Sequence, residues 1–118
     1  MSKNLRLSKT ALLVEDLDIL RKMVRDFLKS LDIEVLEASN AAEAIQTARS
    51  HPGTIDLLLT DVELPGMSGW ESASEIAARR PSIRILYMSA GISLQEWNDY
   101  EGKPVGNYFI RNRFECRN

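Results

Sequence analysis

Ile55-Asp56-Leu57-Leu58-Leu59-Thr60-Asp61 is the stretch of sequence that decides the fold. Its apolar residues occupy consecutive positions, so both faces of a strand here would be buried, which is typical of a central strand in a parallel sheet. The apolar run stops at Asp61, and the loop that follows, residues 64–69, contains one proline and two glycines. The stretch therefore predicts a buried strand over 55–60 with a carboxylate at its carboxyl end.

Similar apolar runs occur on both sides of this strand, and helical patterns separate them. Strands are predicted at 10–14, 33–37, 83–88 and 107–110. Helices are predicted at 17–31, 41–50 and 70–79, with a weaker, polar helix at 93–100. Asn40 and Glu43 form a capping-box-like start for the second helix. This alternation predicts an α/β fold, a doubly wound parallel sheet with helices on both faces, formed by one domain over residues 1–118.

The helix predicted at 17–31 has apolar residues at steps of three and four. They are Leu17, Leu20, Val24, Phe27, Leu28 and Leu31, and this spacing predicts one buried stripe. The basic residues of the same helix, Arg21, Lys22, Arg25 and Lys29, are expected to form a solvated surface. Trp70 and Trp97 are expected to be packing residues.

Composition excludes several classes of protein. The 118 residues are 44% hydrophobic and 27% charged, with a net charge of −2, which is typical of a globular domain and gives no field that would attract nucleic acid. One cysteine and one histidine exclude an internal disulfide and a His/Cys zinc site. Because no apolar run reaches the length of a membrane span and the first residues are polar, we expect a cytoplasmic protein without a membrane partner.

Polar residues follow three of the predicted strands. Glu15 and Asp16 follow the first strand, Asp61 the third and Ser89 the fourth, and the carboxyl ends of parallel strands lie at one edge of a sheet. Three neighbouring carboxylates raise each other's pKa unless a cation is present, and Mg²⁺ is a suitable cation because it prefers oxygen ligands. Each residue also has a simpler explanation. Glu15 and Asp16 suit a helix N-terminus, and Asp61 and Ser89 suit turns.

This combination resembles the receiver domain of bacterial two-component response regulators, such as the chemotaxis receivers. The resemblance extends over about residues 11–114 and is strongest in Leu12-Leu-Val-Glu-Asp16 and in residues 57–69, where Pro65 and Gly69 lie four and eight residues beyond Asp61. It implies a flavodoxin-like sheet of five parallel strands in the order 2-1-3-4-5. Because four residues follow Phe114, the last helix of the family is expected to be absent or truncated here.

The resemblance also implies a role for individual residues. It places the Mg²⁺ ligands at Glu15, Asp16, Asp61 and the backbone carbonyl of Glu63, with Asp16 a direct ligand and Glu15 acting partly through water. Asp61 matches the phosphoacceptor, and Ser89 matches the hydroxyl residue that hydrogen-bonds the new phosphoryl group. Phe109 matches the aromatic residue that moves inward when this hydroxyl moves.

One position departs from the family pattern. The lysine that the family has after its fifth strand corresponds to Asn112, which carries no charge. Three explanations stay open: the role of the lysine is lost, Arg111 or Arg113 replaces it, or Lys103 takes it through a shift of register.

The resemblance implies a signalling domain and not an enzyme, with at most slow self-phosphorylation and self-dephosphorylation. A sensor histidine kinase or phosphotransfer protein would supply the phosphoryl group, and the downstream target would be another protein. The surface formed by 83–88, 93–100 and 107–110 would bind this target or a second copy of the chain.

Two alternatives are a degenerate receiver that acts as a phosphorylation-independent docking module and, less favoured, an aspartate-nucleophile phosphatase, which Asp61-Val-Glu63 imitates loosely. A flavin-binding protein of the same fold is less favoured still, because the first loop lacks phosphate-binding hydroxyl and glycine residues.

Overall fold

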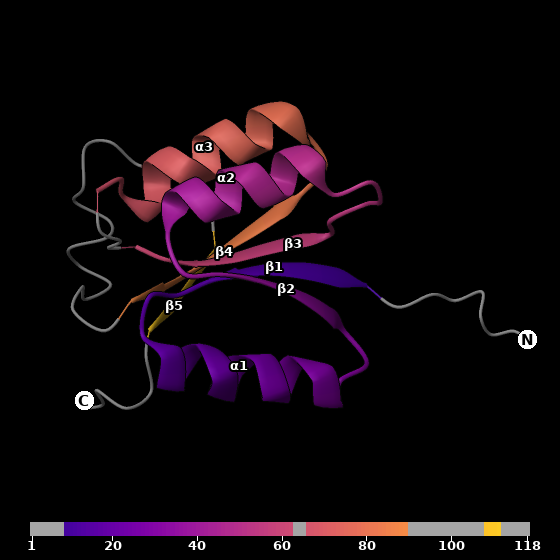
Figure 1. Cartoon of the computed structure of the whole chain (residues 1–118), viewed down its shortest axis with the longest axis vertical. Coiled ribbons are helices and arrows are strands. Elements are labelled where there is room, and N and C mark those ends of the chain that lie inside the picture. Colours follow the sequence, from indigo (N-terminus) through magenta and orange to yellow (C-terminus); the bar gives the residue numbers. More distant parts are fainter. Residues whose placement is uncertain (1–8, 63–65, 90–107, 112–118) are drawn as a thin grey trace, which may run out of the picture.

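The computed structural model describes residues 9–62, 66–89 and 108–111. Its elements alternate along the chain: β1 (Thr10–Val14), α1 (Asp18–Ser30), β2 (Glu34–Ala38), α2 (Ala41–Ser50), β3 (Leu57–Asp61), α3 (Gly69–Arg79), β4 (Arg84–Ser89) and β5 (Tyr108–Arg111). The five strands are parallel and lie in the order β2-β1-β3-β4-β5. In Figure 1, α2 and α3 lie on one side of the sheet and α1 lies on the other.

These elements confirm the predicted α/β class and strand order. The bounds of β1 and α2 and the end of α3 agree with the sequence, and the other bounds differ by one or two residues. The largest difference is at the start of β3, which begins at Leu57 and not at residue 55. Just before it, the backbone N–H of Asp56 donates to the Thr10 carbonyl and the Asp56 carboxylate accepts from the Thr10 N–H, both at 2.8 Å. The helix predicted at 93–100 and the end of the chain after residue 111 lie outside the described residues.

The two faces of the sheet carry separate hydrophobic clusters, because alternate residues of a strand point to opposite faces. The cluster beneath α2 and α3 contains Leu12, Val14, Leu58 and Tyr87 from the strands, and Trp70 from α3 packs into it as expected. The cluster beneath α1 contains Ala11, Leu13, Leu59 and Leu28. Strand β3 contributes to both clusters, as its continuous apolar run predicted.

The single buried stripe predicted for residues 17–31 is confirmed only in part. Val24 and Leu28 pack against the sheet, but Leu17, Phe27 and Leu31 are 61%, 62% and 55% exposed. Leu17 and Leu31 are the N-cap and C-cap residues at the two ends of α1. The helix is turned so that Arg21 and Arg25 reach Glu37 on β2, and Phe27 then lies on the side of the apolar arc that does not face the strands. Ile19 and Met23 are also exposed and extend the part of the apolar arc that does not face the strands.

The N-termini of α2 and α3 are capped by side chains. The Asn40 side chain accepts from the Glu43 N–H at 2.8 Å, as predicted, but the Glu43 carboxylate binds the Ser39 N–H and hydroxyl and not Asn40. At the start of α3, Ser68 and Glu71 form a complete capping box. This box anchors α3 at the end of the loop that follows Asp61. Within the described ranges, no helix has the length and apolarity of a membrane span.

Candidate metal centre

The register of the sheet places Glu15 beside Asp61. Val14 on β1 pairs with Thr60 on β3, so the next residue of each strand lies at the same carboxyl edge. Glu15 continues the alternation of Ala11 and Leu13, which face α1, and Asp61 continues that of Leu59. The side chains of Glu15 and Asp61 therefore leave the sheet on the same side.

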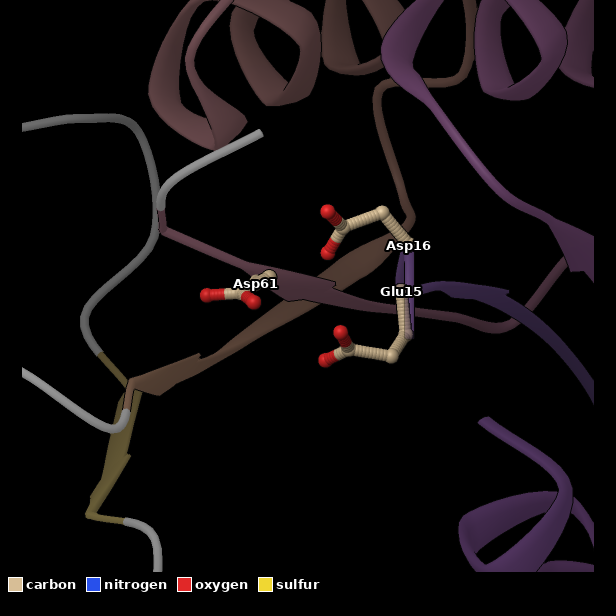
Figure 2. A group of neighbouring side chains, drawn as sticks. All are labelled: Glu15, Asp16 and Asp61. Atoms are coloured by element: carbon tan, nitrogen blue, oxygen red, sulfur yellow. The ribbon is translucent and has the colours of Figure 1, made fainter. Parts of the chain in front are cut away.

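Three carboxylates meet at this edge. Each of Glu15, Asp16 and Asp61 offers one oxygen, and these three oxygens lie within 4.8 Å of one another. Figure 2 shows the carboxylates of Glu15 and Asp16 extending from the end of β1 toward the part of the edge where Asp61 lies. The structure thus brings together the three acidic residues that the sequence placed at the ends of neighbouring strands.

The three side chains differ in exposure. Glu15 is buried, with 1% of its surface exposed, whereas Asp61 is half-buried and Asp16 is exposed. One carboxylate oxygen of Glu15 accepts from the backbone N–H of Leu17 at 3.0 Å. Glu15 therefore binds the backbone N–H of the N-cap residue, but it does not cap α1 in the simpler sense, because the N-cap of this helix has no side-chain cap.

Burial raises the pKa of Glu15 from 4.5 to about 7. The Leu17 N–H opposes this rise because it stabilises the charged form, and the negative charge of Asp61 adds to it, as do hydrogen bonds with Asp16 and Asp61. Repulsion among the carboxylates acts in the predicted direction, but the loss of water around Glu15 is the larger cause. In the absence of a cation, the Glu15 carboxyl therefore titrates near neutral pH.

The donor set suits a hard divalent cation. Three carboxylate oxygens from two adjacent strand ends are ligands of the kind that Mg²⁺ and Ca²⁺ prefer, and they contain no soft sulfur donor. Exposed Asp16 and half-buried Asp61 leave the site accessible from solvent, and Mg²⁺ usually keeps several of its waters. The chemistry and exposure of these residues therefore fit the predicted ion.

A close approach of the backbone explains the glycine eight residues beyond Asp61. The N–H of Gly69 donates to the Val62 carbonyl at 2.8 Å, and a Cβ atom at position 69 would overlap the backbone carbonyl oxygen of Asp61. The same carbonyl oxygen accepts from the Thr60 hydroxyl at 3.1 Å. These contacts fix the backbone that carries the Asp61 side chain.

The remaining predicted site residues are described in part or not at all. Ser89 follows Met88, the register partner of Asp61, so its backbone reaches the same edge one strand further along. Phe109 on β5 pairs with Tyr87. The side chains of Ser89 and Phe109 lie outside the part of the chain that the structure describes, as do Glu63 and Asn112.

Sequence analysis missed the involvement of Arg21. Its side chain is only 13% exposed and donates to the backbone carbonyl of Glu15 at 3.0 Å, so it does not belong to the solvated surface that was predicted. The only signal in the sequence is a position three residues after Asp18 on the same helix, which suits an ion pair. The contact with Glu15 itself depends on how the strand and the helix meet.

Comparison with known proteins agrees with this geometry. Residues 11–101 match the family model of the response regulator receiver domain. The chain is 38% identical to a cyclic di-GMP phosphodiesterase of Thermotoga maritima over 81 residues, a segment that makes up 69% of this chain and 21% of that protein. It is 32% identical to the chemotaxis protein CheY of Listeria monocytogenes over 80 residues, a segment that makes up 67% of this chain and 66% of that protein.

A solved structure is also similar. The response regulator TrrA from Thermotoga maritima, solved in complex with Mg²⁺ and BeF, superimposes with a TM-score of 0.76 at 27% identity, covering 90% of this chain and 88% of TrrA. The chain spans from 9% to 66% of the length of the curated relatives compared, which include sensor kinases. With the strand order, the acidic edge and the matched residues in agreement, this chain belongs to the response regulator receiver domains of two-component signalling.

Proposed function

We propose that this domain accepts a phosphoryl group on Asp61 in a reaction that requires Mg²⁺, and that the modified site switches a protein-binding surface. The observation that carries the proposal is the group of three carboxylate oxygens within 4.8 Å, with Asp61 at the end of the central strand β3. TrrA, a similar structure, was solved with Mg²⁺ and a beryllium fluoride, BeF.

Asp61 would act as the nucleophile. A carboxylate oxygen of Asp61 attacks the phosphorus of a phosphohistidine on a sensor kinase or phosphotransfer protein, and a P–O bond forms while the P–N bond breaks. The electron pair of the broken bond returns to the imidazole, which takes up a proton from water, and Asp61 becomes an acyl phosphate. Glu15, Asp16 and Asp61, with the backbone carbonyl of Glu63, would hold Mg²⁺, which would supply positive charge near the phosphoryl oxygens.

The switch would pass through the neighbouring strands. The backbone of Ser89 lies one residue beyond the register partner of Asp61, which supports a hydrogen bond from its hydroxyl to the phosphoryl group. Phe109 on the adjacent strand β5 would then change its position, which shifts the equilibrium between two states of this surface. Asn112 stands where the family has a lysine and would give a hydrogen bond without charge.

The whole chain as given, residues 1–118, is proposed to be one such domain. It would act as a signalling module with at most slow self-phosphorylation, and its donor would be a sensor histidine kinase or phosphotransfer protein. Sensor kinases of Vibrio campbellii and Brucella abortus contain segments that match this chain, which supports a donor of that class.

Intact-mass analysis after incubation with acetyl phosphate and Mg²⁺ tests the proposal. We expect one added phosphoryl group that hydroxylamine removes, as it does from acyl phosphates. Asp61→Asn should abolish the addition. Asp56→Asn, which changes the acidic residue just before the same strand at its opposite end, should retain it. An addition that persists in Asp61→Asn would place the acceptor elsewhere.

Measurements of Mg²⁺ binding and of phosphate-ester hydrolysis, beside the intact mass, separate the alternative functions. A chain that binds Mg²⁺ but gains no phosphoryl group would indicate a phosphorylation-independent docking module. Continuous hydrolysis of a generic phosphate ester that Asp61→Asn abolishes would indicate a phosphatase.

A further inference from the structure

We propose that Arg21 is a positioning residue of the metal centre, whose guanidinium fixes the peptide group between Glu15 and Asp16 and thereby the directions of both acidic side chains. This inference rests on the proposed function, because it concerns the same Mg²⁺ site.

The guanidinium of Arg21 joins three parts of the fold. Nη1 donates to the Glu15 carbonyl at 3.0 Å, Nη2 to the Asp18 carboxylate at 2.7 Å, and Nε to the Glu37 carboxylate on β2 at 3.0 Å. The Arg21 side chain is only 13% exposed, and all three are charge-assisted hydrogen bonds, of which the one to the Glu15 carbonyl is partly buried and the two to the carboxylates are exposed. Such bonds are stronger than neutral ones and hold their partners in a defined geometry.

The turn between β1 and α1 depends on this side chain. Helix α1 begins without a side-chain cap, because its N-cap residue is Leu17. The backbone N–H of Glu15 is held by the Ala38 carbonyl at 3.1 Å, and the Leu17 N–H is held by the Glu15 carboxylate. The Glu15 carbonyl belongs to the peptide group that also contains the Asp16 nitrogen. A bond to this oxygen therefore sets how both side chains leave the backbone.

A purely electrostatic role for Arg21 would have the opposite consequence. A positive charge near the carboxylates repels a cation, so its removal would tighten metal binding. This repulsion is reduced here because Asp18 and Glu37 both pair with the guanidinium. We therefore expect the loss of geometry to exceed the gain in electrostatics, and the removal of Arg21 to weaken metal binding.

Arg25 provides a matched control. It lies one turn further along α1, and it also pairs with Glu37, at 3.4 Å, and with a neighbouring aspartate, Asp26, at 3.0 Å. Substitution of either arginine by alanine removes one positive charge and one ion pair with β2. The bond to the Glu15 carbonyl is the difference that the comparison isolates.

Titration of the purified chain with Mn²⁺, followed by the electron paramagnetic resonance signal of the free ion and by displacement with Mg²⁺, measures the effect. We expect Arg21→Ala to weaken binding about tenfold, as substitution of residues that orient metal ligands commonly does, and Arg25→Ala to change it less than twofold. Arg21→Lys retains the charge without the planar fork and should bind with intermediate affinity.

Hydrogen exchange of the Leu17 amide in metal-free protein gives a second measurement. We expect faster exchange in Arg21→Ala than in wild type and Arg25→Ala, because the carboxylate that holds this N–H loses its fixed position. Equal or tighter binding of Mn²⁺ by Arg21→Ala would overturn the inference, as would wild-type affinity in Arg21→Lys. If Arg21→Ala does not fold, Arg21→Lys carries both comparisons. A wild-type chain that binds neither ion would overturn the proposed function, and this inference with it.

Discussion

Substitution of Glu15 by glutamine should stabilise the metal-free protein in a way that depends on pH. Glu15 is buried, and its pKa is raised from 4.5 to about 7, chiefly by that burial. Below pH 4.5 the carboxyl is protonated in the folded and the unfolded chain, so it makes no pH-dependent contribution. Between pH 4.5 and 7 the unfolded chain releases the proton and the folded chain retains it, so the free energy of unfolding decreases as the pH rises.

The size of this effect follows from the shift of the pKa. At about 1.4 kcal/mol for each pH unit, the whole decrease is about 3 kcal/mol, and about 2–3 kcal/mol of it falls between pH 5 and pH 8. Glutamine has a similar shape, retains an oxygen that can accept from the Leu17 N–H, and does not titrate. The stability of Glu15→Gln relative to wild type should therefore increase by about 2–3 kcal/mol over this range.

Urea denaturation of both proteins at pH 5 and pH 8, in the presence of a chelator, measures this difference. Glu75→Gln, at an exposed position of α3, serves as the control for the loss of a charge. Addition of Mg²⁺ at pH 8 should stabilise wild type and reduce the advantage of the variant, because the ion compensates the ionised carboxylate. A stability difference that is the same at pH 5 and pH 8 would refute this account of the site.

Three further substitutions test the backbone around the site and the helices. Gly69→Ala should destabilise the protein by about 1–3 kcal/mol and reduce phosphorylation, because its Cβ would displace the backbone of Asp61; an unchanged denaturation midpoint and rate would contradict this contact. Asp32→Gly should increase the free energy of unfolding by about 1 kcal/mol, because residue 32 has a φ of 64°, which glycine adopts without strain. A loss of stability would show that contacts of the Asp32 side chain contribute more than this strain costs. Ser68→Ala should cost about 1 kcal/mol by removing the cap of α3, whereas Ser74→Ala at an exposed position of that helix should cost much less.

The order of the elements could be predicted because each strand and helix has a strong local pattern. The apolar run at 57–59 indicated a central strand, and it lies between β1 and β4. The acidic residues were predicted to meet because parallel strands end at one edge, and the oxygens of Glu15, Asp16 and Asp61 do meet. These features depend on residues close in sequence and on the general geometry of parallel sheets.

The features that could not be predicted depend on how a helix is rotated against the sheet. Periodicity identified the apolar residues of α1 but did not indicate which of them face the strands, because Phe27 belongs to the same broad arc as Val24. The ion pair of Arg21 with Glu37 joins residues sixteen positions apart and helps to set that rotation. For the same reason Arg21 could not be linked to Glu15 from the sequence.

The difference in burial between the two adjacent acids argues for different roles at the same ion. Ionising the buried Glu15 carboxyl costs free energy, because its charge has little contact with water. If Glu15 coordinated a cation directly, part of the free energy of cation binding would be spent on this ionisation. Asp16 is exposed and Asp61 is half-buried, so burial removes less water from their carboxylates. Direct coordination by Asp16 and Asp61 is therefore the less costly arrangement. In the proposed Mg²⁺ site, Glu15 would then act partly through water. Because its pKa is raised to about 7, the affinity for Mg²⁺ would increase with pH.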